Sequence, residues 1–99
     1  MSDIADQSGW QALAAGLMEQ DRFDAVAACI LALALVDKAR DSRTAARLLE
    51  TGHALVLRSL VTLAEEPALI AIDRRDERTM RSFYHVTEQA LALRNQFYK

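Results

Sequence analysis

Two pairs of residues, Glu50 with His53 and His85 with Glu88, have the types and the spacing of metal ligands. Residues three apart on a helix share a side, so each pair could offer a carboxylate and an imidazole to one ion. If the two segments form an antiparallel hairpin, both pairs lie at the same level. However, His53 falls among inward-facing leucines and His85 among polar residues, so a shared site is disfavoured. We therefore expect no metal or other cofactor, and these four residues are the candidate ligands if a metal is bound.

A second candidate site consists of Arg78 and His85, with six residues between them. An arginine can stabilise phosphate charge, and a histidine can transfer protons near neutral pH. The pair resembles the Arg-x(4–6)-His motif of the HEPN family, which are dimeric all-helical ribonucleases. The resemblance covers eight residues, and Thr79 stands where that motif often has a polar Asn, Asp or His. It implies an alternative function, RNA cleavage, with Arg78 and His85 as the catalytic residues.

Helices must position these side chains, because apolar residues recur with helical spacing in most of the chain and no segment alternates with a period of two. Capping residues and the single Pro67 divide the pattern into four helices, at about 9–20, 22–40, 43–65 and 73–97. Gly52 interrupts the third of these. The sequence therefore predicts an all-α fold, a small antiparallel four-helix bundle.

Composition limits the class of protein further. Ninety-nine residues make one domain, 1–99, with residues 1–7 expected to be frayed. Because the net charge is −2, no global basic field attracts nucleic acid or an anionic membrane, and nucleic acid is not an expected partner. The longest apolar run, 25–36, is too short to cross a bilayer. The single Cys29 cannot form an internal disulfide, so a reducing cytoplasm is expected.

The two middle helices carry apolar residues on nearly all sides. A single four-helix core does not easily cover all of them, and an exposed patch of this kind is unusual for a monomer. We therefore predict a non-enzymatic protein-interaction module, acting as a homodimer or heterodimer, such as an adaptor, small chaperone, inhibitor or regulatory subunit. The expected interface residues are Leu31, Leu35, Val36, Leu57, Val61, Phe97 and Tyr98.

Overall fold

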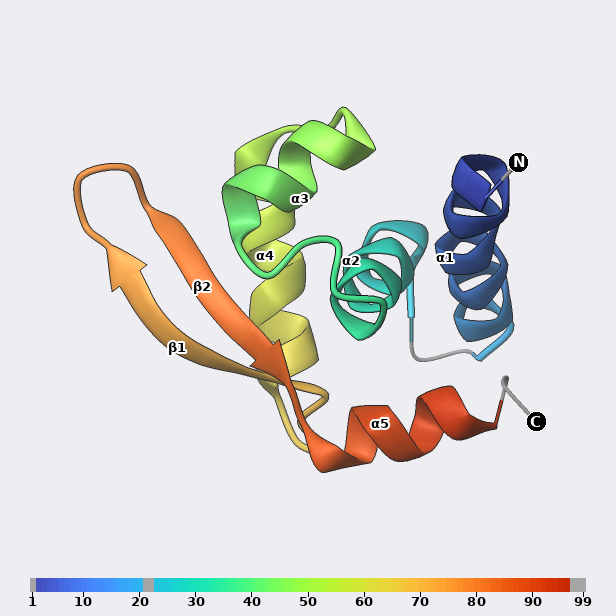
Figure 1. The fold of residues 1–99 in the computed structure, drawn as a ribbon. Coiled ribbons are helices and arrows are strands. Elements are labelled where there is room, and N and C mark those ends of the chain that lie inside the picture. The colour runs from blue at the N-terminus through green and yellow to red at the C-terminus, as the bar shows by residue number, and fades with distance from the viewer. Residues whose placement is uncertain (1, 21–22, 97–99) are drawn as a thin grey trace.

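The computed structural model describes residues 2–20 and 23–96, with side chains from residue 9 onward. It shows five helices and one two-stranded antiparallel sheet (Figure 1). The prediction of an all-α four-helix bundle is therefore wrong, since part of the fourth expected helix forms the sheet. In chain order the elements are α1 (Ser2–Met18), α2 (Ala25–Leu35), α3 (Ser42–Leu49), α4 (His53–Ala64), β1 (Ile70–Asp76), β2 (Arg81–Val86) and α5 (Glu88–Asn95).

The apolar run 25–36 forms α2, which is the centre of the fold. Asp24 caps its first turn by accepting a hydrogen bond from the N–H of Ala27, at 2.8 Å. Eight of its eleven residues are buried. It contacts α1, α3, α4, α5 and β2, which cover most of its surface and leave Ala25 exposed. The helix ends at Leu35, earlier than predicted, and Asp37 then adopts a left-handed conformation with φ 64°.

The third expected helix, 43–65, is in fact two helices. Glu50 adopts a left-handed conformation with φ 51°, which ends α3, and the N–H of Thr51 then bonds to the carbonyl of Ala46 at 3.0 Å. Gly52 is the N-cap of α4. A Cβ added at Gly52 would have no neighbouring atom within 4 Å, so the glycine does not serve close packing of another helix. It marks a break between two helices instead.

The fourth expected helix, 73–97, is replaced by the β1–β2 hairpin and α5. The turn closes where Met80, with φ 62°, donates its N–H to the carbonyl of Asp76 at 2.7 Å. α5 begins after Thr87, whose hydroxyl accepts a hydrogen bond from the N–H of Ala90 and donates one to the carbonyl of Ala68. The tip of the hairpin projects past the helices in Figure 1, and residues 77–80 are exposed.

Residues 40–41, which lead into α3, pair with the edge of β2 that faces away from β1. The N–H of Tyr84 donates to the carbonyl of Arg40 at 3.0 Å, and Asp41 forms an isolated antiparallel bridge with Phe83. The segment thus acts as a very short third strand. It fixes the hairpin to the start of α3.

The core lies between α1, α2, α4 and the base of the hairpin, and it buries Leu31 and Leu35, two of the residues that suggested a partner. Leu31 and Leu35 are only 0% and 6% exposed. The argument that a single chain cannot cover them is therefore incorrect, because four other helices and a hairpin surround α2 where three helices were expected. Among the described residues, no helix is both long and apolar enough to span a membrane.

Candidate functional site

α3 and α4 form a helix-turn-helix. Three residues, Glu50, Thr51 and Gly52, connect the two helices, and α3 crosses α4 in the view of Figure 1. The start of α3 is fixed by Asp41, whose carboxylate accepts hydrogen bonds from the N–H of Thr44 at 3.0 Å and from its hydroxyl at 2.6 Å. Partial burial is the largest single influence on the pKa of Asp41 and raises it. The bonds from Thr44 and the neighbouring Arg81 together outweigh this effect, so the pKa lies below its usual value.

The outer face of α4 is exposed and contains one charged residue. Val56, Leu60 and Leu63 point into the core, which leaves the opposite side of the helix free. At 100° per residue, Arg58 lies in the middle of that side. The exposed residues of this face are Ala54, Leu55, Arg58, Val61 and Thr62. We refer to these five residues as the outer face of α4. Among the described residues, Arg58 forms no ion pair.

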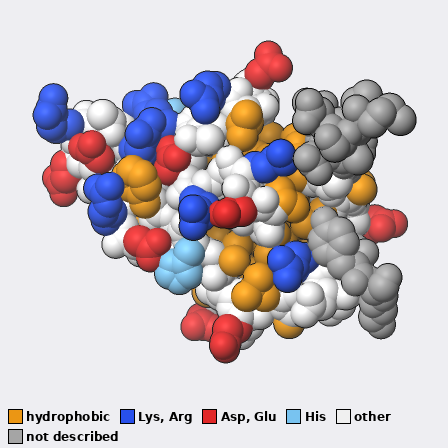
Figure 2. Space-filling view, in the orientation of Figure 1, with side chains coloured by type: hydrophobic (Ala, Val, Ile, Leu, Met, Phe, Trp, Pro, Cys, Tyr) orange, Lys and Arg blue, Asp and Glu red, His pale blue; other side chains and the backbone are white. Residues whose placement is uncertain are grey.

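The β1–β2 hairpin contains four arginines on a short ribbon. The guanidinium of Arg74 lies 4.0 Å from the centre of the Phe83 ring, and that of Arg81 lies 6.0 Å from it. Arg75 donates to the hydroxyl of Ser82 at 3.4 Å. The fourth, Arg78, lies in the turn at the tip. Figure 2 shows Lys and Arg side chains gathered over the hairpin and α3, with acidic side chains among them.

Acidic residues of this region are largely engaged in local contacts. Asp41 pairs with Arg81 at 3.2 Å. Asp73 bonds to His85 at 2.7 Å, and Asp76 accepts the N–H of Arg78 at 2.9 Å within the turn. The guanidinium of Arg78 forms no hydrogen bond or ion pair with the described residues, and Arg78 is exposed.

Besides the Asp41–Arg81 ion pair, two hydrogen-bonded contacts join the hairpin to the helix-turn-helix. Arg43 of α3 donates to the carbonyl of Thr79 at the hairpin tip, at 2.8 Å. The buried hydroxyl of Ser42 accepts the N–H of Ser82 at 2.9 Å and lies 2.7 Å from Nε2 of His53. Ser42 thus hydrogen-bonds both to β2 and to the start of α4. The helix-turn-helix and the hairpin therefore form one connected unit.

His53 is kept neutral by its surroundings. Burial lowers its pKa most, and the nearby Arg43 and Arg81 lower it further, whereas Asp41 opposes them. The ring shares a hydrogen bond with the Ser42 hydroxyl through Nε2. Ser42 is 0% exposed, so this Ser–His pair is a structural contact rather than a nucleophile open to substrate.

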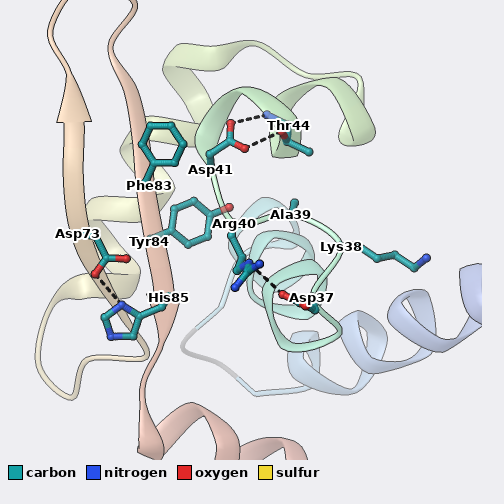
Figure 3. A pocket seen from close by; sticks show the side chains of 10 residues that line it. All are labelled: Asp37, Lys38, Ala39, Arg40, Asp41, Thr44, Asp73, Phe83, Tyr84 and His85. Carbon is teal, nitrogen blue, oxygen red and sulfur yellow. Dashed lines mark hydrogen bonds and ion pairs between the residues drawn. The ribbon is translucent and has the colours of Figure 1, made fainter.

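A cavity of about 510 Å³ lies between residues 37–41 and the hairpin (Figure 3). It is open to solvent, and Asp37 with Arg40 and Asp73 with His85 form pairs along its wall. The Tyr84 hydroxyl is buried without a hydrogen-bond partner. Burial, and to a lesser extent Asp41, raises the pKa of Tyr84, so the phenol stays protonated. Because that hydroxyl is inaccessible, it offers nothing to a ligand in the cavity.

The four candidate metal ligands lie in four different structural settings. Glu50 ends α3, His53 begins α4, His85 is on β2 and Glu88 begins α5. The helical hairpin that would have aligned the two pairs does not form. His53 bonds to Ser42 and His85 to Asp73. Within the described part of the chain, no group of three or more His, Cys, Asp or Glu residues is arranged to hold a metal ion.

Arg78 and His85 do not share a helix face, as the ribonuclease hypothesis required. Arg78 is in the turn and His85 is near the other end of β2. At about 3.3 Å per residue, the four residues from Arg81 to His85 alone separate the two groups by roughly 13 Å. The structure therefore does not bring this pair together on one phosphate.

The expected interface residues are also divided. Leu31 and Leu35 are buried, and Val36 and Leu57 are half-buried against the core. Val61, on the outer face of α4, is 54% exposed. Phe97 and Tyr98 lie outside the described residues. Only Val61 of the described set is thus freely accessible.

No protein-family model, curated protein sequence or solved structure matches the chain significantly. The site must therefore be interpreted from its own geometry.

Sequence reasoning missed the helix-turn-helix and the charge distribution around it. Nine of the twelve Lys and Arg residues lie between residues 37 and 86, with eight of the fourteen Asp and Glu residues. The net charge of the whole chain hides this concentration of arginine. The available signals were Gly52 at the break between two helices and the aromatic stretch Phe83–Tyr84, which favours a strand.

Proposed function

We propose that this chain binds double-stranded DNA, with α4 in the major groove and the β1–β2 hairpin against the adjacent backbone. The observation that carries the proposal is a helix-turn-helix with a three-residue connection, followed directly by an arginine-bearing hairpin. In DNA-binding proteins with a helix-turn-helix, the second helix enters the major groove. The added hairpin makes the arrangement that of a winged helix-turn-helix.

The dimensions of α4 suit this role. Its twelve residues span about 18 Å, and a helix about 10–12 Å across fits a major groove about 12 Å wide. One side of the helix packs on the core, while the outer face is free of other elements. The free side therefore has access to base edges without unfolding any part of the domain.

The hairpin supplies groups suited to phosphate. Arg78 at the tip is unpaired among the described residues, and Arg74 is held over the Phe83 ring rather than by a carboxylate. Such contacts position a protein on the duplex without reading its sequence. Because acidic residues lie among the arginines, we expect a moderate dependence on salt, corresponding to a few phosphate contacts.

The test is binding to a fluorescently labelled duplex of mixed sequence, measured by anisotropy at several salt concentrations. We expect a Kd on the order of micromolar at low salt. Arg78→Ala should weaken binding and reduce the slope of log K against log salt by about one. Arg94→Ala, which removes the same charge from α5, is the matched control and should change neither. Absence of duplex binding at low salt would refute the proposal.

The second candidate is the protein-interaction module predicted from the sequence. It is favoured by the exposed apolar residues Leu48, Leu55 and Val61 on α3 and α4. A homodimer is also compatible with DNA binding, since helix-turn-helix dimers bind two half-sites. Sedimentation of wild type and Val61→Ser separates the two cases. Loss of self-association in the variant, without DNA binding by either protein, would favour the interaction module. The cytoplasmic location expected from the sequence is part of both proposals.

A further inference from the structure

If α4 enters the major groove, its side chains allow only a narrow set of base contacts. We propose that the outer face of α4 reads thymine methyl groups on either side of a guanine that Arg58 contacts. This inference rests on the proposed DNA binding and goes beyond it by naming the base pairs recognised.

The side chains available on this face limit the readout. It contains one arginine, one threonine and three apolar residues. It has no Asn or Gln for bidentate contact with adenine, and no Asp or Glu to accept a hydrogen bond from cytosine. Arginine pairs with O6 and N7 of guanine, and apolar groups contact the C5-methyl of thymine. These are the contacts that the face can make.

The positions of the side chains set the order of the contacts. Arg58 lies in the middle of the face, with Ala54 and Val61 on one flank and Leu55 and Thr62 on the other, at 100° per residue. From Ala54 to Thr62 the helix rises about 12 Å, which corresponds to roughly three to four base pairs. The expected core is therefore one G·C pair with T·A or A·T pairs beside it.

Exposure provides the driving force for this selectivity. Leu55 and Val61 are 40% and 54% exposed, so their apolar surface is in water in the free protein. Contact with a thymine methyl removes that surface from water. Against cytosine, the same side chains would cover an amino group and leave it without a hydrogen-bond partner, which is costly. The exposed leucine and valine thus favour thymine and disfavour cytosine.

Charge favours DNA over a protein as the occupant of this face. An apolar partner would have to accommodate Arg58 in the centre of the contact, without an ion-pair partner from the described part of this chain. The neighbouring elements add Arg43, which reaches the hairpin tip, and the free Arg78. A central cation on an exposed helix face is complementary to the guanine acceptors of a groove.

The experiment begins with selection of duplexes from a random pool by the wild-type protein. The selected duplex is then remade with deoxyuridine for each thymine in turn, which removes only the methyl group, and with 7-deazaguanine for each guanine, which removes the N7 acceptor. We expect a loss of affinity of about three- to tenfold at the core thymines and at one guanine, and none in the flanks.

Variants assign the effects to residues. In Val61→Ser, substitution of deoxyuridine should no longer weaken binding at one core position, while Arg58→Ala should abolish the effect of 7-deazaguanine. Arg78→Ala is the matched control, because it should weaken all duplexes equally. Equal affinity of the wild type for thymine and deoxyuridine duplexes would overturn this inference while leaving DNA binding intact. If the pool is not enriched and no duplex binds, the proposed function itself fails.

Discussion

Ser42 connects three elements of the proposed DNA-binding unit, so removing its hydroxyl should be costly. It lies at the first position of α3, accepts the N–H of Ser82 on β2 and shares a hydrogen bond with Nε2 of His53 at the first position of α4. In Ser42→Ala, both partners lose their bond in a place where Ser42 itself is 0% exposed. The change removes only one oxygen atom, so packing is otherwise preserved.

The magnitude follows from the two lost bonds. The N–H of Ser82 is buried, and a buried donor without an acceptor costs about 1–3 kcal/mol. His53 is only half-buried and can bond to water instead, which adds roughly 0.5–1 kcal/mol. We therefore expect a loss of about 1.5–4 kcal/mol in the free energy of unfolding. For a domain of this size, that lowers Tm by roughly 6–32 °C.

Urea unfolding followed by circular dichroism measures this loss directly. Thr62→Ala removes a hydroxyl from an exposed position of α4 and is the control, with an expected change within about 0.5 kcal/mol. A double-mutant cycle with His53→Ala should give a coupling of about 1 kcal/mol between the two residues. A cost for Ser42→Ala no larger than that of the control would show that the connection contributes little to stability.

Three further predictions concern single groups. Tyr84→Phe should leave stability unchanged or raise it by up to about 1 kcal/mol in urea unfolding, because it removes a buried hydroxyl that has no partner; a clear loss would contradict this. Glu50→Gly should raise the free energy of unfolding by about 0.5–1 kcal/mol, and with it Tm, because glycine adopts a left-handed conformation more easily than glutamate does. The pKa of His53 is lowered by folding, so the unfolded chain binds its proton more readily. The contribution of His53 to the free energy of unfolding should be complete above pH 6.5, which is its usual pKa. This contribution should decline as the pH falls through the lowered pKa of the folded state. Unfolding experiments on His53→Gln should show a weaker pH dependence than wild type in that range.

The sequence predicted the elements whose pattern is set by burial. The run 25–36 is apolar because other elements cover most of α2, and the prediction of a helix there is confirmed. The fourth helix was wrong because Phe83, Val86, Ala90 and Leu93 follow a helical spacing across what are in fact two elements. Of these four residues, only Ala90 is fully buried, so their regular spacing does not correspond to one packed helix face.

The hairpin could not be recognised by alternation along both strands. β1 buries only Ile70 and then extends into solvent, so most of its residues are charged and carry no period of two. β2 does alternate in part, with Ser82 and Tyr84 buried, but a buried serine gives no hydrophobic signal. The turn contains neither glycine nor proline. The candidate site exists because the chain breaks at Glu50 between α3 and α4. A glycine at this left-handed position would have indicated the end of a helix, whereas a glutamate does not.

The outer edge of β1 has a further consequence for the behaviour of the protein in concentrated solution. β2 is paired on both sides, but within the described residues β1 has no neighbour on its far side, so its backbone groups there are available to another molecule. Unprotected edges of this kind promote intermolecular pairing and precipitation. The charged run from Asp73 to Asp76 should prevent it, because a second copy aligned in the same register would place like charges together. The residues that hide the strand from sequence analysis therefore also keep it from aggregating.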